Sequence, residues 1–184
     1  MLNKAAFTLV IICLANSLFA QDVKKEADAV KTKMDVFASK TGTITKFSDT
    51  KLAVLKTTYD NAETRVRKVS SGNISGYFYQ IVKPGKYGST TASIEYSDLV
   101  EVLKAFKILK AEVEKDVAAS PDYLENKFVT VDGFQVGYFV SKAKVSWYLR
   151  LEKYGSDNTL FFDNAETVEN SFTEGKNKID ELRK

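Results

Sequence analysis

The chain of 184 residues contains no histidine and a single cysteine, Cys13. The absence of histidine removes the most common general base, the usual catalytic metal ligand and the Ser-His-Asp triad. Cys13 lies in an N-terminal segment that we expect to be removed, so the remaining chain can form neither disulfides nor zinc–thiolate sites. Any catalysis would have to depend on carboxylates, lysine, serine, threonine or tyrosine.

The sequence also lacks the phosphate-binding patterns GxGxxG and GxxxxGK[ST], and it lacks the alternating oxygen ligands of a calcium loop. Its 27 basic and 24 acidic side chains give a net charge of +3, a balance too mild to indicate nucleic acid or an anionic membrane as partner. No apolar run beyond the N-terminal segment is long enough to cross a bilayer. We therefore expect no metal, no cofactor, no nucleic-acid partner and no transmembrane segment in the mature chain.

The N-terminal segment has the layout of a secretory signal peptide. Lys4 supplies the positive charge, an uncharged apolar run extends from Ala5 to Ala15, and the first acidic residue is Asp22. This layout predicts that residues 1–20 are a signal peptide and that the protein is exported, to the periplasm or to the outside of the cell.

Two details of this segment concern its processing. Cleavage after Ala20 is expected, but Leu18, the third residue before that bond, is not small, and cleavage after Ser17 is the alternative. A lipid anchor on Cys13 is disfavoured, because the preceding Ile12 is bulky and Cys13 lies within the apolar run rather than at its end.

A short helix is expected next, within residues 21–42. Between residues 22 and 38 the apolar side chains recur at steps of four, three, four and three, which places them on one stripe of a helix. The stripe consists of Val23, Ala27, Val30, Met34 and Phe37. Because two heptads are too few for a coiled coil, we expect the helix to pack on its own domain, with a homo-oligomer joined through the stripe as the alternative.

Residues 43–184 predict a single α+β domain whose first half is a set of strands followed by a helix. Residues 64–70 and 75–82 are rich in β-branched and aromatic side chains, and the turn-forming sequence Ser71-Gly72-Asn73 separates them, which predicts a hairpin. A Pro-Gly turn at residues 83–85 and a strand over residues 90–96 follow.

The helix after these strands is expected to begin near Asp98, which has Glu101 three residues later in a capping-box spacing, and to end at Ser120-Pro121. The second half repeats this plan, with a hairpin turn at Asp132-Gly133 and a final helix introduced by Asp163. Its strands are expected over residues 127–131, 134–141, 144–153 and 159–162.

The tetrapeptide KYGS marks the relation between the halves, since it occurs at Lys86 and again at Lys153. The order of hairpin, KYGS turn, short strand, cap and helix is the same in both halves, and Tyr77 corresponds to Trp147, seventy positions on. We interpret the chain as two related ββββα halves, at about residues 51–119 and 125–184, that build an antiparallel sheet with two long helices packed on it. The alternative is that turn chemistry simply recurs in any antiparallel chain.

The most suggestive surface lies on the strand after residue 144. There the apolar residues alternate with a polar and aromatic set that includes Tyr148, Arg150 and Tyr154. Arg65 and Arg67 could share such a face in the first half. Tyrosine and arginine together favour recognition of a protein, a glycan or a planar ligand, although they also occur on solvated sheet faces. Paired carboxylates are the catalytic alternative, and the candidates are Asp132, Asp157 and Asp163, each of which turn chemistry or capping also explains.

The signal ending SLFAQ and the pattern YFYQI…KYGS…ASIEYSDL…YLENKFVT…DGFQVGY…WYL resemble a group of small uncharacterised secreted proteins of Bacteroidetes-type bacteria. The resemblance covers essentially the whole mature chain and implies no activity or site residue. The sequence therefore favours an exported, non-enzymatic binding or interaction module of the cell envelope. The alternatives are a carboxylate-dependent hydrolase acting on envelope material and a structural homo-oligomer joined through the N-terminal helix.

Overall fold

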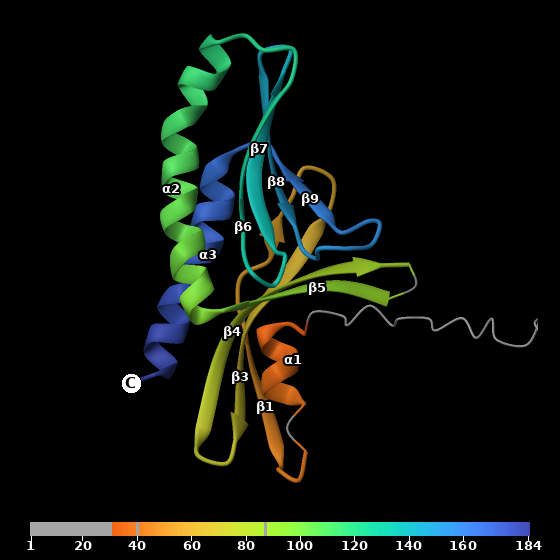
Figure 1. Ribbon diagram of the computed structural model, residues 1–184, viewed down its shortest axis with the longest axis vertical. Helices are drawn as coiled ribbons and strands as arrows, with labels where there is room; N and C mark the ends of the chain where they lie inside the picture. The colour runs from red at the N-terminus through yellow and green to blue at the C-terminus, as the bar shows by residue number, and fades with distance from the viewer. Residues whose placement is uncertain (1–30, 40, 87) are drawn as a thin grey trace, which may run out of the picture. The chain divides into compact units, whose positions relative to one another are not determined.

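Two antiparallel sheets and two long helices form most of the described chain, which comprises residues 31–39, 41–86 and 88–184 of the computed structural model (Figure 1). The elements are α1 (Lys33–Ala38), β1 (Thr45–Lys51), β2 (Leu55–Lys56), β3 (Asn61–Ser71), β4 (Ile74–Gly85), β5 (Gly88–Glu95), α2 (Tyr96–Ala118), β6 (Leu124–Val129), β7 (Gln135–Ser141), β8 (Lys144–Arg150), β9 (Thr159–Phe162) and α3 (Ala165–Leu182). The predicted α+β class, with long helices packed on antiparallel sheet, is confirmed. The predicted signal peptide lies outside the described residues.

Each half of the chain forms its own sheet and then a helix. The first sheet has the order β1-β3-β4-β5, with the short β2 paired to β3, and the second has the order β6-β7-β8-β9. The central hairpins have the same register, because Val66 lies opposite Tyr79 in the first sheet and Val136 lies opposite Leu149 in the second, each seventy positions on. The two halves therefore share connectivity and pairing as well as the order of their elements.

The helices are exchanged between the halves. The α2 helix packs widely on β6 and β7, and α3 packs on β2, β3 and β4. On α2, the ring of Phe106 lies 5.0 Å from that of Trp147 in β8. On α3, the hydroxyl of Ser171 is hydrogen bonded to that of Tyr79 in β4 at 2.6 Å, in the buried interior. Each helix therefore covers apolar surface that belongs to the other half.

Phe172 of α3 lies at the centre of the shared core. Its ring contacts Tyr79 of β4, Phe106 of α2 and Phe134 of the β6–β7 connection, with centroid separations of 6.1, 6.0 and 6.2 Å. All three contacts are edge-to-face, an arrangement that aromatic pairs favour because the positive edge of one ring meets the negative face of the other. One buried cluster of apolar residues thus spans both sheets and both helices.

The predicted Pro-Gly turn is wrong, because Pro84 lies within β4. The pairing of β4 with β3 ends at Val82, so Pro84 pairs only with Ser89 of β5. A proline can be accommodated there because only β4 and β5 are paired at this point, so no third strand requires the N–H that proline lacks. The chain instead reverses between Gly85 and Gly88, which lie opposite each other.

The predicted helix caps are each displaced. The N-cap of α2 is Glu95, whose carboxylate accepts a hydrogen bond from the N–H of Ser97, while Asp98 forms an ion pair with Lys33 at 2.6 Å. The N-cap of α3 is Asn164, whose side chain accepts from the N–H of Thr167 at 3.0 Å. In both cases the residue with extended backbone geometry caps the helix, and the carboxylate one to three residues away does not.

The described part of the N-terminal helix is short and packs on the first sheet. Thr32 and Asp35 form a capping box, so α1 begins at Lys33, and the part of the predicted helix before residue 31 lies outside the described residues. The ring of Phe37 meets Phe78 at 6.5 Å. Because Phe78 adjoins Tyr79 in β4, α1 lies on the face opposite α3. Val23, Ala27 and Val30 of the predicted stripe lie outside the described residues.

The exchanged packing of α3 can be tested at Gly175. A Cβ atom there would lie 2.4 Å from Cδ2 of Tyr79, so Gly175→Ala should lower the free energy of unfolding by about 1–3 kcal/mol through overpacking. Helix propensity alone has the opposite sign, since replacing glycine by alanine in a helix gains about 1 kcal/mol. Urea unfolding of the mature protein measures the difference. The control is Asn177→Ala on the exposed face of the same helix, which should not destabilise; a Gly175→Ala protein as stable as wild type would contradict the packing.

Candidate functional site

The second sheet has two chemically distinct faces. Trp147 and Leu149 of β8 point to the helices and belong to the common core, whereas Tyr148 and Arg150 point to the opposite, outer face. The register places Phe139 of β7 and Phe161 of β9 on the same outer face as Tyr148. Within the described part of the chain neither long helix covers this outer face, because α2 and α3 both pack on the other side.

Aromatic rings form a row across this outer face. Tyr123 stacks on Phe139 at 6.2 Å, Phe139 meets Phe161 edge-to-face at 6.4 Å, and Phe161 meets Tyr59 at 6.3 Å. The two end rings are largely exposed, Tyr123 at 63% and Tyr59 at 79%, while Phe139 and Phe161 are partly covered. We call the row Tyr59, Phe161, Phe139 and Tyr123, together with the strand residues beside it, the aromatic face.

Tyr59 reaches the aromatic face from the other half of the chain. It lies between β2 and β3, and the neighbouring Thr58 donates its N–H to the carbonyl oxygen of Phe161 at 2.8 Å. This backbone contact closes part of the outer edge of β9 and fixes Tyr59 against Phe161. The row is therefore composed of residues from both halves.

Tyr148 lies next to the row but serves an internal purpose. Only 4% of the residue is exposed, and its hydroxyl donates a hydrogen bond to Oε1 of Glu125 on β6. Burial raises the pKa of Tyr148, so it remains protonated and cannot act as a base near neutral pH. The same hydrogen bond, with Lys127 at 3.4 Å, holds the pKa of Glu125 below its usual range.

Arg150 and Gln135 face each other across β8 and β7 at one end of the aromatic face. Among the hydrogen bonds and ion pairs of the described residues, the guanidinium of Arg150 takes part in none, although its charge contributes to lowering the pKa of Glu125. Oε1 of Gln135 is buried and has no hydrogen-bond partner within the same part of the chain. A buried oxygen of this kind costs free energy unless a ligand or water supplies a donor.

The other predicted site residues lie elsewhere. Tyr154 is 76% exposed in the connection between β8 and β9, with the ammonium of Lys153 5.3 Å from its ring centroid. Arg67 of β3 forms a two-pronged hydrogen bond with Asp49 of β1, both prongs 2.7 Å long, which keeps the pKa of Asp49 low. Arg65 donates to Gln80 at 2.7 Å and lies 3.6 Å from Asp49.

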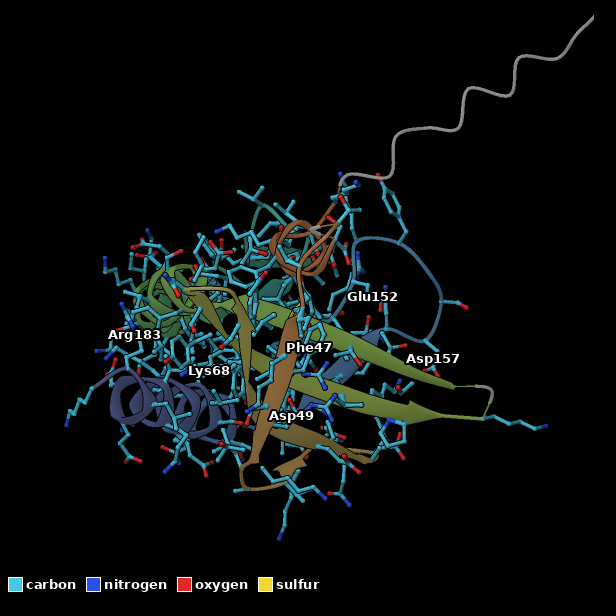
Figure 2. The ribbon with its side chains drawn as sticks, turned by 90° about the horizontal axis from the view of Figure 1, so that it is seen from below. Phe47, Asp49, Lys68, Glu152, Asp157 and Arg183 are labelled. Atoms are coloured by element: carbon cyan, nitrogen blue, oxygen red, sulfur yellow. The ribbon has the colours of Figure 1, made fainter. Side chains whose placement is uncertain are left out.

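The two arginines of the first sheet are thus occupied by partners within the chain. Asp49 and Phe47 lie on the same strand, β1 (Figure 2), and the guanidinium of Arg67 lies 5.6 Å from the ring centroid of Phe47. Of the five predicted site residues, the structure places Tyr148 and Arg150 together on the second sheet and Arg65 and Arg67 together on the first. Tyr154 is in a loop. Sequence reasoning missed Tyr59, Tyr123, Phe139 and Phe161, because the alternation within a strand does not tell which strands are neighbours.

The candidate carboxylates do not converge. Asp132, between β6 and β7, accepts from the N–H of Lys33 at 3.0 Å, and burial raises its pKa. Asp157, between β8 and β9, forms an ion pair with Lys83 of β4, near the β4–β5 hairpin in Figure 2. Asp163 is exposed just before α3. Each therefore lies on a separate connection, and no pair flanks a common cleft as a two-carboxylate hydrolase requires.

A pocket of about 270 Å³ lies between the segment around β2 and α3. Ser171 lines it, but the hydroxyl of Ser171 bonds Tyr79, whose pKa burial raises, and Glu174 accepts the N–H of Ala53 at 3.2 Å. Ser171 therefore has no base beside it. Among the described residues no group of three or more potential ligands could hold a metal ion, and no helix there is both long and apolar enough to cross a membrane.

Comparison with known protein families, curated proteins and solved structures finds no match to this chain. The aromatic face must therefore be interpreted from its own chemistry. Exposed aromatic rings beside hydrogen-bonding side chains are typical of binding surfaces, because such rings offer large contact area at a small cost in conformational entropy.

The internal role of Tyr148 predicts a pH-dependent effect. Tyr148→Phe removes the donor to Glu125 and should lower the free energy of unfolding at pH 7 by about 1 kcal/mol. A carboxyl group whose folded-state pKa is depressed contributes stability above its unfolded pKa, and that contribution is lost as the pH falls through the folded value. The difference in free energy of unfolding between the wild-type protein and Tyr148→Phe should therefore shrink below about pH 4. Urea unfolding at pH 7, 5 and 3 measures it, and a difference that grows toward pH 3 would contradict the assignment.

Proposed function

We propose that this protein is an exported, non-enzymatic binding module of the bacterial cell envelope and that its ligand contacts the aromatic face. The observation that carries the proposal is the row of four rings that ends in an exposed tyrosine on each side. Apolar surface of this kind on one face of a sheet, bordered by polar residues, marks a site of interaction. A polar side chain beside the rings, Arg150, can donate hydrogen bonds that orient the ligand.

Export is part of the proposal and is supported by the N-terminal layout of Lys4 and the apolar run that follows it. Without a cysteine after Cys13, the exported chain cannot form disulfides and must be stabilised by its hydrophobic core. The cluster shared by both sheets and both helices satisfies that requirement.

Binding is favoured over hydrolysis by the position of the candidate catalytic groups. Asp132, Asp157 and Asp163 lie on separate connections, and the buried tyrosines have raised rather than lowered pKa values. Assembly through the N-terminal stripe is disfavoured because Phe37 already packs on Phe78 and Gly76 of its own sheet. The hydrolase thus lacks a converging pair of carboxylates, and the homo-oligomer lacks an unoccupied Phe37.

The proposal is tested by co-sedimentation of the mature protein, residues 21–184, with the insoluble envelope fraction of its host. Tyr59→Ala and Tyr123→Ala should each weaken binding about fivefold or more, since loss of an aromatic contact at a binding surface typically costs over 1 kcal/mol. The matched control is Tyr154→Ala, which removes a similarly exposed tyrosine from the β8–β9 connection, outside the ring row, and should bind as wild type does.

Circular dichroism and thermal unfolding should show that all three variants remain folded, because each ring is mostly exposed. If Tyr154→Ala weakens binding as much as the face variants do, the contact is not confined to the aromatic face. If the wild-type protein stays in the supernatant while remaining folded, it does not bind the envelope and the proposed function is wrong.

A further inference from the structure

The electrostatic character of the aromatic face is set by a few side chains. Lys127 and Glu125 of β6 form an ion pair, and Glu125 also accepts the hydroxyl of Tyr148. The negative charge of Glu125 is therefore balanced by Lys127, and its carboxylate already accepts a hydrogen bond from Tyr148. The charge of Arg150 also acts on Glu125, but within the described chain no acidic side chain lies within hydrogen-bonding distance of its guanidinium.

A guanidinium is suited to bind a carboxylate, because its planar set of N–H donors matches the two oxygens of that group. By the seventy-residue correspondence, Gln135 and Arg150 stand where the first sheet has Arg65 and Gln80, and there Arg65 donates to Gln80 at 2.7 Å. Arg67, on the same outer face of the first sheet, provides a second comparison. Arg67 makes both hydrogen bonds to Asp49, whereas Arg150, on the corresponding outer face of the second sheet, makes none among the described residues. Within the described chain the guanidinium of Arg150 therefore has no bonded carboxylate and can accommodate one from a ligand.

The form of the face favours a saccharide over a peptide. A peptide that binds a sheet through its backbone adds a strand to the sheet edge, whereas these rings lie on the face of the sheet, where the backbone groups already pair between strands. A sugar ring presents C–H groups on its faces and hydroxyl groups at its rim. The slightly positive C–H groups pack on the negatively polarised faces of aromatic rings, and the hydroxyl groups reach the polar residues beside the row.

We propose that the ligand of the aromatic face is an acidic saccharide whose carboxylate binds Arg150 and whose sugar rings pack on Phe161, Phe139 and the exposed tyrosines. This inference rests on the proposed function and adds the chemical class of the ligand.

The test uses three soluble polymers as probes in affinity electrophoresis of the mature protein: polygalacturonate, its fully methyl-esterified form, and polyglutamate. The first has sugar rings and carboxylates, the second has the rings without the charge, and the third has the charge without the rings. Wild-type protein should be retarded by polygalacturonate alone. Arg150→Gln should weaken that binding about tenfold, as expected for loss of one charge-assisted contact.

Two variants serve as references in this experiment. Lys107→Gln removes one exposed charge from α2, on the helix side, and should leave retardation unchanged. Tyr123→Ala should weaken retardation without changing the charge. Thermal unfolding of each variant establishes that the fold is retained.

Other outcomes would overturn the inference in distinguishable ways. Equal retardation by the methyl-esterified polymer would leave a saccharide-binding face and the proposed function intact while removing the role of Arg150. Equal retardation by polyglutamate would show that charge alone suffices. No retardation by any polymer, from a protein that still co-sediments with the envelope through Tyr59 and Tyr123, would reject an acidic saccharide but not the binding function.

Discussion

The packing of Phe172 against rings from three other elements is the contact on which the rest of the molecule depends. Its partners Tyr79, Phe106 and Phe134 come from the first sheet, from the helix of the first half and from a connection of the second sheet. These groups bury much of their apolar surface against the other half, because α2 packs mainly on the second sheet and α3 mainly on the first, although α2 also contacts β4 and β5. The two sheets, the two helices and the hydrogen bond between Tyr79 and Ser171 therefore form one cooperative unit.

This exchange also explains why the outer faces are available. With both helices on one side, the outer surface of each sheet has to be covered by short segments or by its own side chains. The first sheet uses α1, whose Phe37 covers Phe78, and the network of Arg67 with Asp49. Among residues 31–39, 41–86 and 88–184 the second sheet has no such helix on its outer face, and Tyr59 from the first half joins its rings at the surface. The chemical difference between the two outer faces is thus a consequence of where the helices are placed.

Much of the fold could be predicted because its determinants are local. The hairpin turn at Gly72 and Asn73, the strand over residues 159–162 and the repeated order of elements all follow from residues close together in the chain. The exact caps and the turn after Pro84 could not be predicted, because the backbone geometry of Glu95 and the end of the β3 pairing at Val82 are set by distant strands. The same limit applies to the site. Alternation identified Tyr148 and Arg150 as neighbours on one face, but the ring row depends on pairing between strands and on a contact from the other half.

The correspondence between the halves has a further consequence for how such a chain could arise. A single ββββα unit, whose helix packs mainly on another sheet, would leave much of its own sheet exposed to water and would need a second copy to cover it. An assembly of two identical copies would necessarily present two identical outer surfaces. Joining them in one polypeptide releases that symmetry, since one surface can keep Arg67 matched to Asp49 while the other leaves Arg150 unmatched beside its rings. Fusion thereby allows a symmetric assembly to become a protein whose two outer surfaces differ in chemistry.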